Sequence, residues 1–233
     1  MKNIQPQQPA HLSPYARTCL DALVKVDLAK HISLGEALGL FHYLDYRSTR
    51  DVDAWWSDST TGRQRQALVS ALETALSEFG RVNTRSWGDV VSVELFQDNK
   101  AVFSFQIATR SSQLQASIPA GWIDVPLDSL PDLVASKMVA LVERGAPRDF
   151  LDIYSLCKAG LLNASECWAL WRQRQNLSGN DTDALRARLA IETHLERIAL
   201  HRPLESIADA DQREQARQVR NWFASVFLKA NND

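Results

Sequence analysis

The chain has 233 residues, of which 45% are hydrophobic and 23% are charged, and its formal net charge at pH 7 is −2. This composition is typical of a globular protein that can bury a sizeable core. Because the net charge is small, no overall basic field would recruit nucleic acid or an anionic membrane, so a polyanion would have to bind to a local patch. The three cysteines, Cys19, Cys157 and Cys167, lack metal-ligand spacing and indicate reduced thiols rather than a disulfide framework.

The N-terminal segment, residues 1–13, is polar and rich in Pro and Gln, and it is predicted to be a flexible arm. It contains no apolar stretch of the kind found in signal peptides. Nowhere does the chain approach the ~20 apolar residues that a membrane span needs. We therefore expect a cytoplasmic protein with no membrane partner.

Residues 14–56 are predicted to contain a helix, a strand or turn with a short helix, and a second strand. Ser13 and Pro14 fit the N-cap and the first turn of the first helix. Residues 32–44 are apolar and are interrupted by two glycines, which favours a strand or turn that leads into a short helix. After a polar, charged turn, the side chains of residues 51–56 alternate between the two faces of a short predicted strand.

Residues 62–126 complete the predicted α/β part of the chain. An amphipathic helix is expected over residues 62–79. Two alternating runs, residues 90–96 and 101–108, read as strands, and the polar tetrad between them fits a hairpin. Residues 122–125 are a candidate for one more strand.

Every element predicted beyond Pro126 is a helix. The expected helices cover residues 127–144, 147–158, 164–174, 182–199 and 209–229. The sequence therefore predicts an α+β protein in which a mixed core over residues 14–126 is followed by a helical domain over residues 127–233.

Asp51 and Asp53 are the first candidates for chemistry. Two carboxylates one residue apart on a strand point to the same side and can hold one or two divalent cations. Such cations orient a triphosphate and neutralise the charge that develops in phosphoryl or nucleotidyl transfer. By itself the pair also occurs on solvated turns, but Gly35 lies upstream and the run Arg47-Ser48-Thr49-Arg50 directly precedes it. Glycine permits a close approach of backbone to phosphate, and hydroxyl and guanidinium groups can donate to its oxygens.

A second group of charged residues lies in the predicted helices after residue 127. Its members are Lys137, Arg144, Arg148, Asp149 and Asp152. Lys137 and Arg144 are seven residues apart and share a helix face. Pro147 can open the next helix, which would bring Arg148 close to Asp152. On spacing alone, a surface ion pair between Arg148 and Asp152 beside two solvated cations is the better explanation of the pattern.

Together the two groups resemble the AbiEii/MenT family of minimal nucleotidyltransferase-like proteins, which are usually the toxins of bacterial toxin–antitoxin or phage-defence pairs. The family pattern is a Gly-Gly or Gly-Ser turn, an Arg-x-Ser/Thr-x-Asp-x-Asp segment, a lysine on a helix, and an Arg-Asp-x-x-Asp helix. The matching segments of this chain lie between residues 33 and 154. The resemblance implies a polymerase-beta-type mixed-sheet core followed by a C-terminal helical bundle, with a nucleotide bound in the cleft that the helical domain completes.

The resemblance also assigns roles to individual residues. Asp51 and Asp53 match the carboxylates that bind Mg²⁺ (or Mn²⁺). Asp152, and next to it Asp149, match the acidic residues of the second motif, which join Lys137 in the catalytic set. The residues implied in binding the nucleoside triphosphate are Gly35, Arg47, Thr49, Lys137 and Arg148. The implied reaction is transfer of a nucleoside monophosphate to an acceptor hydroxyl, for which RNA, particularly a tRNA 3′ end, is the suggested acceptor and an antitoxin protein the suggested partner.

Three departures from the family pattern leave alternatives open. Leu34 replaces the first small residue of the turn, and Glu36 brings a carboxylate to a position that is usually small or hydroxylated. The third carboxylate of the wider superfamily has two candidate positions, Gln106, whose amide is a poor Mg²⁺ ligand, and Glu94, which keeps the charge. The alternatives are a catalytically weak or inactive protein that acts by binding a partner, and a kinase-like phosphotransferase.

Overall fold

The computed structural model describes residues 4–230, so the first three residues of the predicted arm lie outside the described residues. The chain divides into two compact units, Ile4–Leu133 and Val134–Asp233, with the boundary inside helix α4 (Leu130–Glu143). We call the described parts of these units the sheet unit and the helical unit. None of the helices within residues 4–230 combines the length and the hydrophobicity that a membrane span requires.

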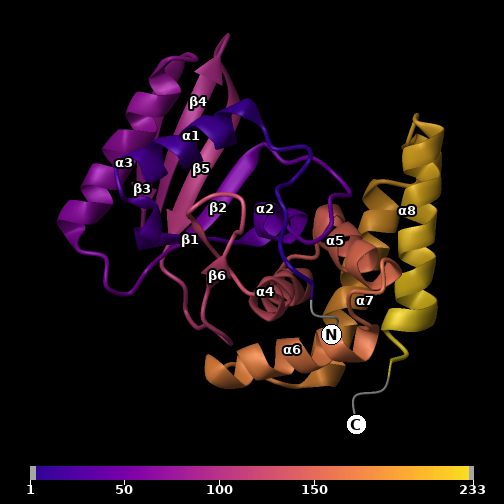
Figure 1. Cartoon of the computed structure of the whole chain (residues 1–233). Helices are drawn as coiled ribbons and strands as arrows, with labels where there is room; N and C mark the ends of the chain where they lie inside the picture. The colour runs from indigo at the N-terminus through magenta and orange to yellow at the C-terminus, as the bar shows by residue number, and fades with distance from the viewer. Residues whose placement is uncertain (1–3, 231–233) are drawn as a thin grey trace. The chain divides into compact units, whose positions relative to one another are not determined.

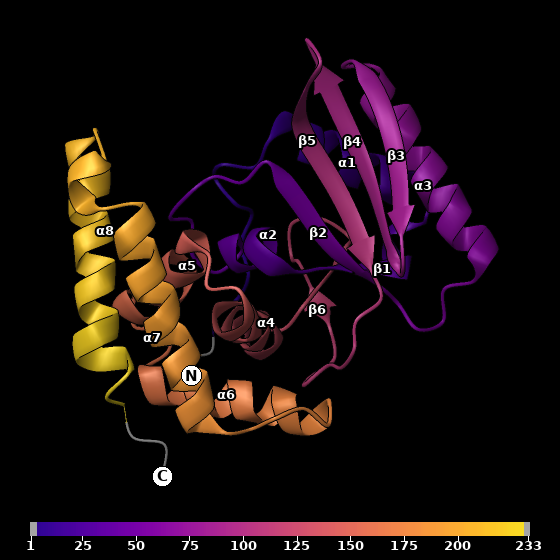
Figure 2. The same cartoon turned by 180° about the vertical axis from the view of Figure 1, so that it is seen from behind.

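The sheet unit is built on a mixed sheet (Figures 1 and 2). Among the described residues the strands follow the order β3-β4-β5-β2-β1-β7-β6. Their bounds are β1 Ile32–Leu34, β2 Asp51–Trp56, β3 Arg81–Trp87, β4 Val90–Gln97, β5 Lys100–Ala108, β6 Ile118–Pro119 and β7 Pro126–Leu127. The β2–β5 and β1–β7 pairs are parallel and the others are antiparallel. The predicted mixed α/β core is thus confirmed.

One face of the sheet is apolar and packs against two helices, α1 (Pro14–Lys25) and α3 (Gly62–Ser77). Figure 2 shows the strands β3, β4 and β5 in front of these helices. On β2 the side chains of Val52, Ala54 and Trp56 are buried, whereas those of the alternating residues are half-buried. The same apolar face includes five residues of β4 and β5: Val93, Leu95, Phe103, Phe105 and Ile107. Asp51 and Asp53 therefore belong to the opposite, more polar face, as their alternation predicts.

The helix starts follow local capping chemistry. Ser13 is the N-cap of α1, because its Oγ accepts a hydrogen bond of 3.0 Å from the amide of Ala16, and Pro14 takes the first turn. At α3, Thr61 and Gln64 form a capping box. A six-residue helix, α2 (Glu36–Phe41), follows β1 directly, as the apolar segment interrupted by glycines predicts.

Two sequence predictions for strands need correction. Strand β3 was not predicted; it pairs with β4 along its whole length, but most of its residues are exposed, so it has no apolar alternation. The strand predicted over residues 122–125 is wrong, because this segment is a bend between the short strands β6 and β7. Val125 is buried there without joining a ladder, and its amide donates to the carbonyl of Ile123 over 2.9 Å. Burial in the core, rather than strand pairing, produced the apolar pattern of this segment.

Between residues 4 and 13, hydrogen bonds of Gln7 and His11 connect the chain to the segment that precedes β2. The amide of Gln7 donates to the carbonyl of His42 over 2.8 Å. The ring Nδ1 of His11 lies 3.0 Å from Oδ1 of Asp45. The segment from residue 4 to residue 13, which forms no helix or strand, leads into α1.

In the helical unit the described residues form helices and connecting turns. The helices are the remainder of α4, α5 (Pro147–Lys158), α6 (Ala164–Leu177), α7 (Ala184–His201), a short 3₁₀ turn (Leu204–Ser206), α8 (Ala210–Trp222) and a π turn (Phe223–Phe227). Aromatic rings form the centre of this unit: Phe223 packs edge-on against Phe150 of α5 at 4.8 Å, and Phe227 lies 5.4 Å from Trp168 of α6. The π turn therefore turns two buried phenylalanines toward α5 and α6.

Candidate active site

The acidic pair lies on β2 beside a hydroxyl and an amide of the neighbouring parallel strand. In the register of β2 and β5, Asp51 is opposite Ser104 and Asp53 is opposite Gln106. Because directly opposed residues project to the same face, these four side chains share one patch of the sheet. Ser104 Oγ donates a hydrogen bond of 2.8 Å to Asp51 Oδ1. Both aspartates are half-buried, so their carboxylates can be approached from solvent while Ser104 fixes the orientation of one of them.

The register also places the two candidates for a third carboxylate. Gln106 is the residue next to Asp53 on the adjacent strand, whereas Glu94 is one strand further away, on β4, opposite Ser104. Glu94 Oε1 accepts a hydrogen bond from Arg85, and its Oε2 is buried without a hydrogen-bond partner in the described residues. Within residues 4–230 there is no group of three or more His, Cys, Asp or Glu side chains that could hold a metal ion. Glu94 as a third ligand stays a prediction.

Two carboxylates nevertheless fit a magnesium ion. Mg²⁺ commonly binds through one or two carboxylates, keeps several waters and completes its shell with substrate phosphates. Asp51 and Asp53 provide the hard oxygen ligands, on one face and partly open to solvent. We therefore take these two residues as the ones that would hold the ion.

The turn between β1 and α2 lies against the acidic strand. The amide of Gly35 donates to the carbonyl of Asp53 over 2.8 Å. A Cβ added at Gly35 would lie 2.4 Å from Nε1 of Trp55, so this position has no room for a side chain. Glu36 follows with φ of +48°, a left-handed conformation that disfavours residues other than glycine. The predicted nucleotide-binding glycine is thus held beside Asp53 by backbone hydrogen bonding and by the indole of Trp55.

Arg47 and Thr49 shape the segment that leads into β2. The amide of Asp51 donates to Thr49 Oγ1 over 3.3 Å, so the hydroxyl orients the backbone at the start of the strand. The guanidinium of Arg47 lies 5.1 Å from the ring centre of Phe41 and 5.9 Å from that of Tyr46. Thr49 thus contacts the start of β2, whereas Arg47 packs on the rings of Phe41 and Tyr46, and the roles of both residues toward a nucleotide stay predictions.

A buried network of three residues was missed by sequence reasoning. Arg110 Nη2 donates to Ser33 Oγ and, over 2.6 Å, to Asp128 Oδ1, and Ser33 Oγ also donates to Asp128 Oδ1 over 2.8 Å. Burial raises the pKa of Asp128 above its ordinary value, although the charge and hydrogen bond of Arg110 and the hydroxyl of Ser33 oppose the rise. The side chain of Arg110 is only 10% exposed. No short-range pattern could reveal this network, because its members are far apart in the sequence.

Arg110 also connects this network to the face of the acidic pair. Its guanidinium carbon lies 5.7 Å from the ring centre of Trp55, which projects to the same face of β2 as Asp53. Its Nη1 is buried and has no hydrogen-bond partner among the described residues. A buried donor without a partner is costly, so this nitrogen is suited to bind an acceptor oxygen of a ligand.

The second charged cluster lies in the helical unit and is buried. Lys137 Nζ lies 3.6 Å from Asp149 Oδ1 and 3.4 Å from Asp152 Oδ2, and all three side chains are at most 2% exposed. Arg144 holds Asp149 with two hydrogen bonds, from Nε over 2.9 Å and from Nη2 over 3.0 Å. The surface ion pair and the solvated cations that spacing alone allowed are therefore wrong for this cluster.

The pKa of Asp149 is held below its ordinary value. Burial raises the pKa, but the hydrogen bonds from Arg144 and the positive charges of Lys137 and Arg144 outweigh it. Asp149 Oδ2 also accepts from the amide of Ala146 over 3.3 Å, which satisfies a free N–H at the start of α5. The cluster is thus a fixed set of charges in which Asp149 is ionised at neutral pH.

Arg148 does not join this cluster, contrary to the spacing argument. Its side chain is exposed and lines a pocket of the helical unit, together with Leu151 one turn later on α5. Asp149 and Asp152 point to the buried side of the same helix. The acidic residues of the motif face inward because they pair with Lys137, and Arg148 at the adjacent position consequently faces outward.

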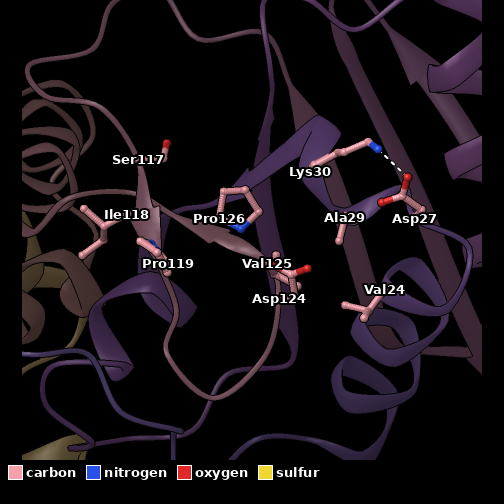
Figure 3. Close-up of a pocket in the computed structure, with 10 residues that line it drawn as sticks. All are labelled: Val24, Asp27, Ala29, Lys30, Ser117, Ile118, Pro119, Asp124, Val125 and Pro126. Atoms are coloured by element: carbon pink, nitrogen blue, oxygen red, sulfur yellow. Dashed lines mark hydrogen bonds and ion pairs between the residues drawn. The ribbon is translucent and has the colours of Figure 1, made fainter.

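Two pockets of the sheet unit are lined by residues other than the predicted site residues. A pocket of about 270 Å³, drawn in Figure 3, is lined in part by Asp27, Lys30 and Asp124. Asp27 and Lys30 form an ion pair with each other there. This pocket therefore offers few unpaired groups for a ligand.

Paired carboxylates on a strand of a mixed sheet, after a glycine turn, are the features of a nucleotidyltransferase-like protein. A protein-family model described as the nucleotidyl transferase AbiEii toxin of type IV toxin–antitoxin systems matches residues 35–226. The chain belongs to this AbiEii family, which confirms the resemblance that the motifs suggest and implies an antitoxin partner. No curated protein shows significant similarity to the chain.

Proposed function

We propose that the protein transfers a nucleoside monophosphate from a nucleoside triphosphate to an acceptor hydroxyl and releases pyrophosphate. The observation that carries this proposal is the placement of Asp51 and Asp53 on one face of β2, with Ser104 holding Asp51 by a hydrogen bond of 2.8 Å. Membership of a nucleotidyl transferase family supports the reaction class.

In this proposal, Asp51 and Asp53 hold Mg²⁺ (or Mn²⁺), which when bound neutralises phosphate charge and lowers the pKa of an attacking hydroxyl. Gly35, whose missing side chain leaves room for the indole of Trp55, keeps the β1–α2 turn beside Asp53, where the family motif implies phosphate binding. Arg110 Nη1 offers a further donor beside Trp55, and Thr49 fixes the start of β2. The family motif implies roles toward the nucleotide or the acceptor for Lys137, Arg148, Asp149 and Asp152 as well. Lys137, Asp149 and Asp152 would take these roles from the buried cluster in which they pair with one another.

For the acceptor we propose RNA, in particular a tRNA 3′ end. A terminal ribose presents the hydroxyl groups that such a transfer requires. The test is incubation with each α-labelled nucleoside triphosphate, Mg²⁺ and total RNA, followed by detection of labelled RNA. Asp53→Asn should abolish labelling, whereas Asp58→Asn, which changes an exposed aspartate just after β2, should not. Labelled RNA formed equally by both variants would contradict the proposal.

A second candidate function is favoured by one observation. Gln106, an amide, lies opposite Asp53, and the described residues offer no third carboxylate grouped with the pair. A protein with a weakened metal site could act by binding its partner instead. In that case no label would transfer, and binding of the antitoxin would be the same for Asp53→Asn and the unchanged protein. Transfer from γ-labelled nucleotide only would indicate kinase-like chemistry.

A further inference from the structure

The helical unit contains a pocket of about 370 Å³ formed by α5, α7, α8 and the 3₁₀ turn before α8. This volume falls within the range of about 300–1,000 Å³ that is usual for small-molecule sites. Its apolar lining comes from Phe150, Leu151, Leu195, Ile198, Ile207 and Val219. The pocket therefore has a hydrophobic interior built from helices that are separate in the sequence.

Three arginines also line this pocket, each from a different element. Arg148 is in the first turn of α5, Arg202 caps the C-terminal end of α7, and Arg220 is near the end of α8. No acidic residue is among the lining residues. Among the described residues, no carboxylate lies within 4 Å of the side-chain nitrogens of these three arginines. The pocket thus combines an apolar interior with three positive charges that are not in ion pairs.

The charges of Arg202 and Arg220 are close enough to affect one another. Burial lowers the pKa of Arg220, and the positive charge of Arg202 lowers it further, with a partial opposing effect from Glu205. Arg220 Nη2 donates to the carbonyl of Arg202 over 2.7 Å, which holds the two residues together. Like charges gathered around an apolar pocket repel each other unless an anion neutralises them.

Some other arginines of the same unit have carboxylate partners, whereas Arg188, Arg197 and Arg213 donate to backbone carbonyls. Arg144 binds Asp149, Arg186 binds Asp181 and Asp183, and Arg217, on the same helix as Arg220, pairs with Glu214. Arg148, Arg202 and Arg220 therefore differ from these residues in that all three line one apolar pocket.

We propose that this pocket binds a phosphate monoester with a flat apolar body, of about the size of a nucleoside monophosphate. Guanidinium groups donate pairs of hydrogen bonds to phosphate oxygens, and three of them match a dianion better than a single carboxylate. The apolar lining receives the body of the ligand, and Gln212 and Gln215 can donate to or accept from its polar edge. The site is distinct from the residues proposed for nucleotidyl transfer except for Arg148.

The test is titration calorimetry of the full chain with two probes, 1-naphthyl phosphate and AMP. Each is compared with its uncharged counterpart, 1-naphthol and adenosine. EDTA is present, so that no divalent cation supports phosphate binding at Asp51 and Asp53. The test variants are Arg202→Gln and Arg220→Gln, and Ala216→Phe fills the pocket without removing a charge.

The matched controls are Arg217→Gln, which removes a paired arginine from the same helix outside the pocket, and Asp53→Asn. We expect at least one phosphate probe to bind the unchanged protein in a saturable way, and at least about 10-fold more tightly than its uncharged counterpart, because charge-assisted hydrogen bonds contribute most of the affinity. Arg202→Gln and Arg220→Gln should each weaken binding about 10-fold or more, and Ala216→Phe should abolish it. Both controls should stay within about 2-fold of the unchanged protein.

Three results would overturn the proposal. The first is no saturable binding of either phosphate at millimolar concentration by the folded protein. The second is equal binding of the phosphates and their uncharged counterparts. The third is binding that Asp53→Asn removes but Arg202→Gln and Arg220→Gln leave unchanged, which would place the probe at the acidic pair. Because the readout is binding without metal, its failure is distinct from failure of the proposed nucleotidyl transfer.

Discussion

Nζ of Lys137 lies 3.4 Å from Oδ2 of Asp152, and the two side chains are 2% and 0% exposed. Removing one partner of a buried ion pair strongly destabilises a protein, because the other charge is left poorly solvated and without a counter-charge. Asp149 Oδ1 lies 3.6 Å from the same ammonium group and also pairs with Arg144, so Lys137 and Arg144 together compensate the two buried carboxylates. The cluster has a structural role whatever its part in catalysis.

We therefore predict that Lys137→Met lowers the free energy of unfolding by about 3–5 kcal/mol. Urea denaturation at pH 7, followed by circular dichroism, measures the change. The double variant Lys137→Met with Asp152→Asn should recover much of the loss, because it removes one of the uncompensated charges. A single Lys137→Met variant as stable as the unchanged protein would contradict the importance of the cluster. A loss of activity in a Lys137 variant indicates a catalytic role only if this measurement shows that the variant is still folded.

Ser104 orients Asp51, so its hydroxyl should matter for transfer. We predict that Ser104→Ala reduces the rate of label transfer about 10–100-fold, the usual effect of removing a group that orients a metal ligand. Raised Mg²⁺ should restore part of the rate, since the loss is in metal binding. Ser104→Thr, which keeps a hydroxyl on the same strand position, is the control and should retain more activity. Equal activity of Ser104→Ala and the unchanged protein would rule out this role.

The contact between Gly35 and Trp55 should be sensitive to a single methyl group. An added Cβ would lie 2.4 Å from the indole Nε1, so Gly35→Ala forces the ring or the turn to move. We predict a loss of about 1–3 kcal/mol in the free energy of unfolding, the usual cost of overpacking. The double variant Gly35→Ala with Trp55→Ala should lose less stability than the two single variants lose together, because removing the indole removes the clash. Strictly additive effects would show that the two residues do not clash.

Arg110 should have a pH-dependent effect through Asp128. The pKa of Asp128 is raised in the folded protein, so the stability contributed by its protonated form is complete below the ordinary pKa of 3.8 and is lost as the pH rises through the raised value. Arg110 opposes this rise. Arg110→Gln should therefore raise the pKa of Asp128 further and lower the free energy of unfolding by about 3–5 kcal/mol at neutral pH.

The free energy of unfolding that Arg110→Gln loses should be smaller at pH 4.5 than at pH 7.5, because protonation of Asp128 removes the uncompensated charge in this variant. Urea denaturation at both values measures this difference. The double variant Arg110→Gln with Asp128→Asn is the control, and its stability should depend less on pH. A loss in Arg110→Gln that is the same at both pH values would show that the charge of Asp128 is not involved.

Much of the fold could be predicted because it depends on neighbours in the sequence. The helix that starts at Ser13 and Pro14 is defined by a cap and a first turn within four residues. Strand β2 was predicted from the alternation of its six side chains, which burial on one face produces directly. Strand β3 has exposed side chains and exists through pairing with β4, so its sequence carries no comparable signal.

The candidate site was predictable only where a motif records it. Asp51, Asp53, Lys137 and Asp152 follow from the resemblance to the AbiEii family, which the family match over residues 35–226 confirms, while their individual roles stay predictions. The partners of these residues were not predictable. Ser104 and Asp51 are 53 positions apart in the sequence, and only the pairing of β2 with β5 brings them into contact. Arg148, assigned to phosphate binding by the motif, lines a pocket of the helical unit and does not meet Asp152, as its spacing had suggested.

By itself, the sequence determined the acidic pair on one face of a strand and the family to which the chain belongs, because alternation and motif spacing are short-range properties of the chain. Only the tertiary structure decided what surrounds that pair. The register of β2 and β5 set Ser104 and Gln106 beside Asp51 and Asp53, and folding joined Ser33, Arg110 and Asp128 from three distant segments. The reason is physical: hydrogen bonds and buried charges are satisfied by whatever packing brings near, and separation along the chain does not record that proximity.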